Sequence, residues 1–166
     1  MSNAIGESIS RLVEASGAEV KRACYQGDVG LHVAKAVWGI RKRFEDKGLT
    51  LQDASVKDLG KAYAEGSEAY ETDEKTKAEI NSLNKVIFEK SNAVVNKMYE
   101  VGRLLSLEHF EEIYKVLGTK FNHYFFEGIE GRDGQKIVEN AIGKVFEKSD
   151  GAIVYKGEKH RLHTRV

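Results

Sequence analysis

The 166-residue sequence contains no proline and only one cysteine, Cys24. Average proline usage near 5% would give about eight prolines, so their absence favours long, uninterrupted helices. One cysteine cannot form an internal disulfide, and without a Cys-x-x-Cys pair the sequence offers neither a zinc ribbon nor a thiol redox centre. We therefore predict that Cys24 is simply a small buried residue.

Long apolar runs and net charge are lacking as well. No apolar run approaches the roughly 18 residues of a membrane span, and no basic start followed by an apolar stretch marks a secretory signal. Twenty-six basic residues balance 26 acidic ones, which argues against binding of nucleic acid by bulk charge alone. With 41% apolar residues, the composition is typical of a globular chain, and we predict a cytoplasmic protein without a membrane partner.

The N-terminal part predicts an α/β arrangement. Apolar residues at helical spacing predict a helix over 2–16, and alternation over 19–25 predicts a strand. The turn-rich segment Gln26-Gly27-Asp28-Val29-Gly30 then opens a second helix that ends near Gly48. Because a β-α-β unit begins on a strand and this chain begins almost inside a helix, we expect an opening strand upstream of Met1.

Residues 49–118 are predicted to be entirely helical. Asp53 or Ser55 can cap a first segment that runs to about Thr72. Apolar residues then recur every seven positions from Ile80 to Val101. Two of the four partner positions are polar, which favours a long packed helix over a coiled coil.

A last helix of this region is expected to begin at a Ser106 cap and to end at Gly118. Mixed structure follows. Lys120–Phe126 predicts a buried strand, and a glycine-rich connection leads to a helix over about 133–146. A strand at 152–155 is expected to pair with a strand at 162–166.

The predicted fold is therefore α/β and dominated by helix. It combines a partial Rossmann-like parallel sheet, a long helical insertion and a C-terminal β segment. The corresponding parts are a truncated helix-strand-helix over 1–48, the helical insertion over 49–118, and a strand-helix-hairpin segment over 119–166.

The glycine turn after the first strand is the best candidate for a ligand site, because ligands of open parallel sheets bind where strand ends meet helix starts. Gly27 and Gly30 allow close backbone approach, Asp28 lies near the helix N-terminus, and His32 follows one turn later. The same residues also suit a plain turn and cap, since the helix dipole stabilises an aspartate there without a ligand. Both interpretations stay open.

No other motif indicates a catalytic group or a tightly bound cofactor. His160 and His163 have no third ligand in suitable spacing, so no metal site is predicted. A Gly-x-x-x-x-Gly-Lys-Ser/Thr loop is absent, and a P-loop enzyme has no support.

Several stretches, in order along nearly the whole chain, carry a resemblance to one family: Ser2-Asn3-Ala4-Ile5-Gly6-Glu7, Tyr25-Gln26-Gly27-Asp28-Val29-Gly30-Leu31-His32-Val33-Ala34-Lys35, Ala62-Tyr63-Ala64-Glu65-Gly66-Ser67, Gly118-Thr119-Lys120-Phe121, Tyr124-Phe125-Phe126-Glu127, Ser149-Asp150-Gly151-Ala152-Ile153 and Leu162-His163-Thr164-Arg165-Val166. The sequence resembles the catalytic domain of arginyl-tRNA synthetase, a class I aminoacyl-tRNA synthetase.

The resemblance implies a class I Rossmann-like domain that activates arginine with ATP and magnesium and transfers it to tRNA(Arg) in protein biosynthesis. Gly27, Asp28, Gly30 and His32 match the family's Gly-Asp-x-Gly segment, which borders the active-site cleft. The family's His-x-Gly-His and Lys-Met-Ser-Lys-Ser-type signatures are absent from the 166 residues. We therefore expect a fragment of the ligase that is inactive alone.

The alternative is a non-catalytic binding module or a complementing piece of a split synthetase. Unpaired strand edges would favour self-association or binding to the rest of a synthetase. In that case apolar side chains such as Ile5, Val20 and Val154 are expected to be partly exposed.

Three residues depart from the family's pattern. Asn122 stands where aspartate is usual, Gly128 where serine is, and Arg161 where glycine is. If position 161 requires a positive φ, the arginine costs about 1 kcal/mol or more.

Overall fold

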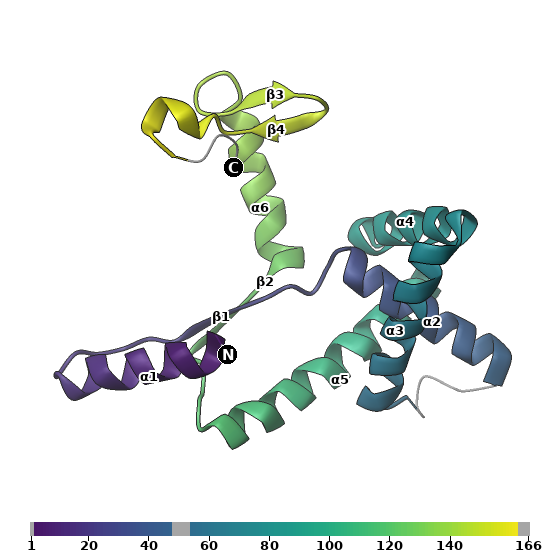
Figure 1. Ribbon diagram of the computed structural model, residues 1–166, viewed down its shortest axis with the longest axis horizontal. Helices are drawn as coiled ribbons and strands as arrows, with labels where there is room; N and C mark the ends of the chain where they lie inside the picture. The colour runs from purple at the N-terminus through teal and green to yellow at the C-terminus, as the bar shows by residue number, and fades with distance from the viewer. Residues whose placement is uncertain (1, 48–53, 163–166) are drawn as a thin grey trace. The chain divides into compact units, whose positions relative to one another are not determined.

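The computed structural model describes residues 2–47 and 54–162. It consists of two compact units, the first extending to Phe125 and the second beginning at Phe126. The elements in chain order are α1 (Ser2–Ala15), β1 (Ala23–Gln26), α2 (Leu31–Lys47), α3 (Val56–Thr72), α4 (Glu74–Glu89), α5 (Ala93–Leu117), β2 (His123–Phe126), α6 (Glu127–Asn140), β3 (Glu147–Ser149), β4 (Ala152–Val154) and a short 3-10 helix (Gly157–His160) (Figure 1). The helix-dominated α/β prediction is confirmed, with 68% helix, a small parallel sheet and a C-terminal antiparallel pair among the described residues.

The first unit is built around one apolar core between α2, α4 and α5 (Figure 1). The buried side chains of this core are Ala34, Val37 and Trp38 from α2, Ile80, Leu83 and Ile87 from α4, and Val95 and Met98 from α5. The spacing of three and four residues within each helix places these side chains on one face, which is why each helix packs inward along a single stripe.

Short polar side chains determine where α3, α4 and α5 begin. Ser55 caps α3 in a capping box, in which its hydroxyl accepts from the Asp58 amide and the Asp58 carboxylate accepts from the Ser55 amide. Asp73 and Asn92 cap α4 and α5 with a side chain that accepts from the second and third amides of the helix. The Ser55 cap was one of two expected, and the other, Asp53, lies outside the described residues.

The predicted long helix across the heptad pattern is wrong. Lys90 adopts a left-handed conformation, with φ of 55°, and ends α4 before α5 begins. Ile80 and Ile87 are buried on α4, whereas Val94 on α5 is 65% exposed. The seven-residue pattern therefore spans two helices, and its α4 residues are buried while Val94 on α5 is exposed to solvent.

The predicted cap at Ser106 is also wrong, and the predicted stop at Gly118 is confirmed. Ser106 lies inside α5, where its hydroxyl donates to the carbonyl oxygen of Gly102. Gly118 ends α5 with φ of 65°, a conformation that glycine adopts without a steric penalty.

Helices α2 and α3 approach each other at backbone distance. A Cβ atom added to Gly39 would lie 2.8 Å from the Cα of Ala62, and one added to Gly66 would lie 2.8 Å from the carbonyl carbon of Lys35. Beside this contact the buried guanidinium of Arg43 donates to both carboxylate oxygens of Glu65, with Nε–Oε2 of 2.9 Å. The helix pair is therefore held by small residues and by one forked ion pair.

Helix α1 is attached to the strands through Glu7. Its carboxylate accepts hydrogen bonds from Arg11 (2.8 Å), Arg22 (3.0 Å) and Thr119 (2.7 Å). Arg22 precedes β1, and its carbonyl oxygen accepts from the Asn122 and His123 amides at the start of β2. One carboxylate thus links α1 to both strands of the small sheet.

The strands are shorter and less buried than predicted. A strand was predicted over 19–25, and β1 covers only Ala23–Gln26. β2 covers His123–Phe126, whose residues are alternately exposed and half-buried. The strand predicted at 120–126 is therefore confirmed over 123–126, but its predicted burial is wrong, because pairing with a single neighbour leaves little of either strand enclosed.

The second unit differs from the prediction in its pairing. β3 and β4 are antiparallel, with Glu147 opposite Val154, across a turn at Asp150-Gly151 in which both residues have positive φ. The expected start of a partner strand at Leu162 is wrong, because β4 pairs with β3 and Leu162 lies in a bend. Residues 163–166 lie outside the described residues.

Helix α6 begins earlier than expected. It spans Glu127–Asn140 in place of about 133–146. The glycines expected to loosen the connection, Gly128, Gly131 and Gly134, lie within the helix. A helix can tolerate each of them at a cost of about 1 kcal/mol relative to alanine.

The three departures from the family's pattern have different structural consequences. Asn122 supports the sheet, because its side-chain oxygen accepts a hydrogen bond of 2.9 Å from the Arg22 amide. Gly128 lies in the first turn of α6. Arg161 has φ of 58°, so this position does favour glycine, and the arginine costs about 1 kcal/mol there.

The close contact between α2 and α3 predicts that Gly39→Ala destabilises the first unit by about 3 kcal/mol or more, because the new methyl group collides with backbone that cannot move aside. Gly60→Ala is the matched control, since Gly60 lies on α3 with open space around its Cα. We expect this control to be neutral or stabilising by up to about 1 kcal/mol. Urea denaturation followed by circular dichroism measures both, and equal stability of the two variants would contradict the contact.

The Glu7 cluster predicts a dependence of stability on acid pH. Hydrogen bonds from Arg11, Thr119 and Arg22 lower the pKa of Glu7 from 4.5 to about 2. The carboxylate therefore stabilises the folded state fully above pH 4.5, and this contribution is lost as the pH falls from 4.5 through about 2.

We expect Glu7→Gln to lower the thermal midpoint at neutral pH and the difference from the parent protein to shrink between pH 4.5 and about 2. Thermal unfolding across this range measures the effect. Glu19→Gln is the control, because Glu19 forms only an exposed ion pair of 3.6 Å with Lys21. If the thermal midpoints of Glu7→Gln and the parent protein differed by the same amount at every pH in this range, the lowered pKa of Glu7 would be contradicted.

Candidate functional site

The turn between β1 and α2 is shaped by local backbone hydrogen bonds. The Asp28 amide donates to the Gln26 carbonyl oxygen at 3.0 Å, and the carbonyl oxygen of Gly30 accepts from the amides of Val33 and Ala34. Gly30 has φ of 113°, a conformation that L side chains rarely adopt, so a glycine is required where the chain enters the helix. The sequence of the turn therefore determines the start of α2.

His32 closes the turn from the first residues of α2. Its Nε2 atom forms a hydrogen bond of 3.0 Å with the carbonyl oxygen of Gly27. Since a carbonyl oxygen can only accept, Nε2 carries the proton. The imidazole is thereby oriented by the glycine turn itself.

A cavity of about 540 Å³ opens beside this turn within the first unit. Gln26, Gly27, Asp28 and His32 form its polar end, and the remaining wall comes from α2, α3 and α5. The apolar and aromatic side chains of this wall include Val37, Ile40, Leu59, Tyr63, Leu107 and Phe110. The cavity lies at the carboxyl end of β1, which is where open α/β sheets bind ligands.

Asp28 is held by two side chains of α5. Its Oδ2 atom accepts from the Tyr99 hydroxyl at 3.0 Å and from Arg103 Nε at 3.0 Å. The Asp28 side chain is only 9% exposed, so the ion pair with Arg103 is shielded from solvent. Burial and the adjacent carboxylate of Asp28 raise the pKa of Tyr99 to about 12, which keeps its hydroxyl protonated as a donor.

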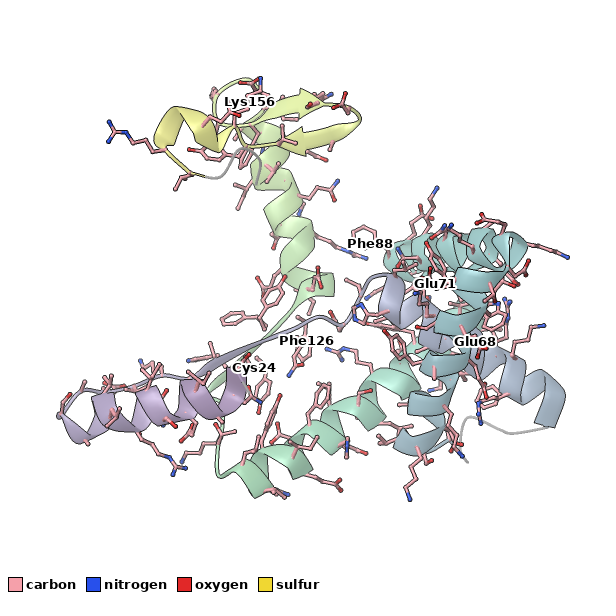
Figure 2. The ribbon with its side chains drawn as sticks, viewed as in Figure 1. Cys24, Glu68, Glu71, Phe88, Phe126 and Lys156 are labelled. Atoms are coloured by element: carbon pink, nitrogen blue, oxygen red, sulfur yellow. The ribbon has the colours of Figure 1, made fainter. Side chains whose placement is uncertain are left out.

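A second polar group lies behind the turn on β1. The buried Gln26 side chain donates to the Cys24 sulfur at 3.3 Å and to the Tyr114 hydroxyl at 3.5 Å. Cys24, which Figure 2 labels on β1, is half-buried and lies 3.7 Å from the same hydroxyl. Burial raises the pKa of Tyr114, and the cluster joins β1 to the C-terminal half of α5.

Three of the four predicted site residues come together. Gly27, Asp28 and His32 line the cavity, whereas Gly30 shapes the turn without lining it. Sequence reasoning missed Tyr99 and Arg103. Their spacing of four on a helix shows that they share a face, but no pattern in the sequence connects that face to Asp28.

Metal-binding and membrane-spanning features were searched over residues 2–47 and 54–162. In these ranges no three histidine, cysteine, aspartate or glutamate residues are grouped as ligands for a metal ion. No helix in the same ranges is both long and apolar enough to cross a membrane.

A parallel strand that ends in a glycine turn, a helix that starts at that turn, and a cavity at their junction define a partial α/β domain of the Rossmann-like class. A family model described as "tRNA synthetases class I (R), catalytic domain" matches residues 1–122. The chain belongs to this family, as its sequence motifs predict.

Curated relatives give the same result. The arginine–tRNA ligase of Borreliella burgdorferi is 25% identical over 154 residues, which cover 90% of this chain and 26% of that protein. Arginine–tRNA ligase 1 of Bacillus cereus is 27% identical over 166 residues, which cover 97% of this chain and 28% of that protein. The chain thus spans about a quarter of the length of the curated relatives it matches.

The shielded ion pair predicts that Asp28→Ala destabilises the first unit by about 2 to 4 kcal/mol, because Arg103 and Tyr99 lose their shared acceptor. Glu19→Ala removes an exposed ion pair, with the glutamate side chain 83% exposed, and should change stability by less than about 0.5 kcal/mol. Urea denaturation compares the two variants. An Asp28→Ala protein as stable as Glu19→Ala would show that the carboxylate does not hold α5.

Proposed function

We propose that these 166 residues form part of the catalytic domain of an arginine–tRNA ligase and that the Gly27–Gly30 turn borders its substrate cleft. The family match over residues 1–122 carries this proposal. The whole ligase activates arginine with ATP and magnesium and transfers it to tRNA(Arg), and a cytoplasmic location follows from that activity. The cavity at the end of β1 supports the position of the cleft.

In this proposal the residues of the glycine turn form one edge of the substrate cleft and orient the side chains there. Gly27 permits close approach of a substrate to the backbone, and Asp28 keeps its charge balanced by Arg103 at the edge of the cavity. His32 is oriented by the Gly27 carbonyl oxygen. The three-part division at residues 48 and 118 belongs to the same proposal, with the helical segment as an insertion in the catalytic domain.

The chain alone is expected to be inactive. Adenylate formation depends on positioned groups that stabilise the phosphates of ATP, and the 166 residues hold neither the His-x-Gly-His nor the Lys-Met-Ser-Lys-Ser-type signature. We expect no arginine-dependent exchange of pyrophosphate into ATP by the purified chain. Exchange above that of a heat-denatured sample would contradict this expectation.

A complementing piece of a split synthetase is the second candidate. The observation that favours it is the apolar face of α1, where Ile5, Ile9 and Leu12 are 54%, 56% and 72% exposed. Val20 and Val154 are half-buried, so the expected partial exposure of these side chains is confirmed. Exposed apolar surface of this extent favours a partner.

The test supplies the missing parts in trans. The two segments of the Bacillus cereus ligase that flank its matched region are added to the chain, and arginine-dependent pyrophosphate exchange is measured. We expect activity only when all three pieces are present. The Gly39→Ala chain serves as the control, since its unfolding should prevent complementation. If the Gly39→Ala chain and the parent chain gave equal pyrophosphate exchange, the folded chain would contribute nothing to the activity.

A further inference from the structure

The peptide group that joins Gly27 to Asp28 is held at both ends. Its N–H group donates to the Gln26 carbonyl oxygen at 3.0 Å. Its carbonyl oxygen forms the hydrogen bond of 3.0 Å with His32 Nε2. Because a peptide group is planar and stiff, its two ends can only move together. A displacement of Asp28 therefore changes the direction of the Gly27 carbonyl and moves the acceptor of His32.

The imidazole of His32 depends on this acceptor. His32 is exposed and lines the cavity, and an exposed side chain samples several rotamers unless a contact selects one. Within the described residues, the bond to Gly27 is the one hydrogen bond of the imidazole. Since Nε2 donates in it, the neutral ring has its acceptor at Nδ1. The Gly27 carbonyl thus decides where the cavity presents this acceptor.

Asp28 itself is held from a distant part of the chain by α5. Tyr99 and Arg103 are one turn apart on this helix and both line the cavity. Both donate to the same atom, Asp28 Oδ2, at 3.0 Å. The carboxylate is only 9% exposed, so water weakens these charge-assisted bonds little. Two donors on one oxygen fix both the distance and the direction of the turn relative to α5.

The same helix also holds the residue on the other side of Gly27. Tyr114 follows Arg103 by about three turns, which places it on the same face of α5. Its hydroxyl accepts at 3.5 Å from the side chain of Gln26, which is 8% exposed. Gly27 has no side chain of its own to anchor it. Both neighbours of the residue that orients His32 are thus attached to one helix.

We propose that Tyr99 and Arg103 are positioning residues of the cleft, which act through Asp28 to fix the Gly27 carbonyl and, with it, the imidazole of His32. The proposal rests on the proposed function, because the glycine turn is the edge of a substrate cleft only if the chain is part of the ligase. Neither side chain has to touch the substrate in this role. The helix α5 thereby takes part in the reaction through the arrangement of the turn.

Amide hydrogen exchange in the ¹⁵N-labelled chain tests whether α5 holds the turn. The amide of Asp28 reports on the turn, and that of Leu83, in the buried part of α4, reports on unfolding of the whole first unit. Arg103→Met removes the charged donor and keeps an unbranched side chain. We expect exchange at Asp28 to become about tenfold faster relative to exchange at Leu83, because the turn opens locally. An unchanged ratio of the two rates would show that Arg103 stabilises the unit without positioning the turn, and would overturn the proposal.

The carbonyl carbon of Gly27 tests the effect on His32. A chain labelled with ¹³C at the glycine carbonyl carbons gives a resonance for Gly27 that depends on the hydrogen bond from His32. His32→Ala removes the bond and defines the position of the resonance without it. We expect Arg103→Met to move the resonance most of the way to that position. A resonance that His32→Ala shifts and Arg103→Met leaves in place would overturn the proposal, as would one that neither variant shifts.

Removal of a single hydroxyl group provides the matched comparison. Tyr99→Phe removes a donor to Asp28, whereas Tyr124→Phe removes a hydroxyl that donates to a different carboxylate, that of Glu111 on α5. We expect Tyr99→Phe to speed exchange at Asp28 by about threefold relative to Leu83 and Tyr124→Phe to leave the ratio unchanged. Equal effects of the two variants at Asp28 would overturn the proposal. If Arg103→Met fails to fold, this pair of variants decides.

Pyrophosphate exchange connects the positioning to the reaction. The Arg103→Met chain, with its folding verified by circular dichroism, is combined with the two flanking segments of the Bacillus cereus ligase. We expect arginine-dependent exchange to be about tenfold or more below that of the parent mixture, because a misplaced group at the substrate lowers the rate steeply. Equal exchange by the two mixtures would overturn the role of Arg103 in the reaction. Absence of exchange in the parent mixture would count against the ligase proposal alone, since the exchange rate at Asp28 and the Gly27 resonance still decide whether α5 positions the turn.

Discussion

The backbone contact between α2 and α3 is the constraint on which the first unit depends. Gly39 against Ala62 and Gly66 against Lys35 allow the two helices to approach more closely than larger side chains permit. This approach places the middle of α2 beside the part of α3 that carries Ala62 and Tyr63, and both helices contribute to the wall of the cavity next to the glycine turn. The cavity exists because the two helices are close at their crossing and α5 contributes the remaining wall.

Ion pairs and charged hydrogen bonds also hold the elements of the first unit together. Glu7 attaches α1 to the segments beside the strands through two donors, Arg22 and Thr119, and Asp28 attaches the glycine turn to α5 through two. Arg43 and Glu65 reinforce the contact of α2 with α3. In each case a short segment is held by a charged group from a distant part of the chain, so the local turn or helix alone would not keep its position.

The extent to which this structure follows from the sequence depends on the range of the interactions. Local signals predicted well at two places, since Ser55 caps α3 and Gly118 ends α5. The break at Lys90 was missed because a lysine in a left-handed conformation has no sequence signature, and its cost is met by packing of the two helices it separates.

Only the part of the candidate site that depends on local interactions was predicted. Gly27, Asp28 and His32 are near neighbours in the sequence, so their proximity follows from one turn and one helical repeat. Tyr99 and Arg103 reach Asp28 only through the tertiary fold. The pairing of β4 with β3 was likewise missed, because Glu147-Lys148-Ser149 lacks the β-branched and aromatic residues that indicate a strand.

The two bonds to Asp28 have a consequence for the order of folding. They close loops of 71 and 75 residues, so the glycine turn cannot acquire its final arrangement until α5 has formed and docked. Closing such a loop costs conformational entropy before any contact compensates for it, and contacts of this separation form late. During synthesis the turn leaves the ribosome long before Arg103 does. The cavity beside this turn is therefore among the last parts of the first unit to be assembled.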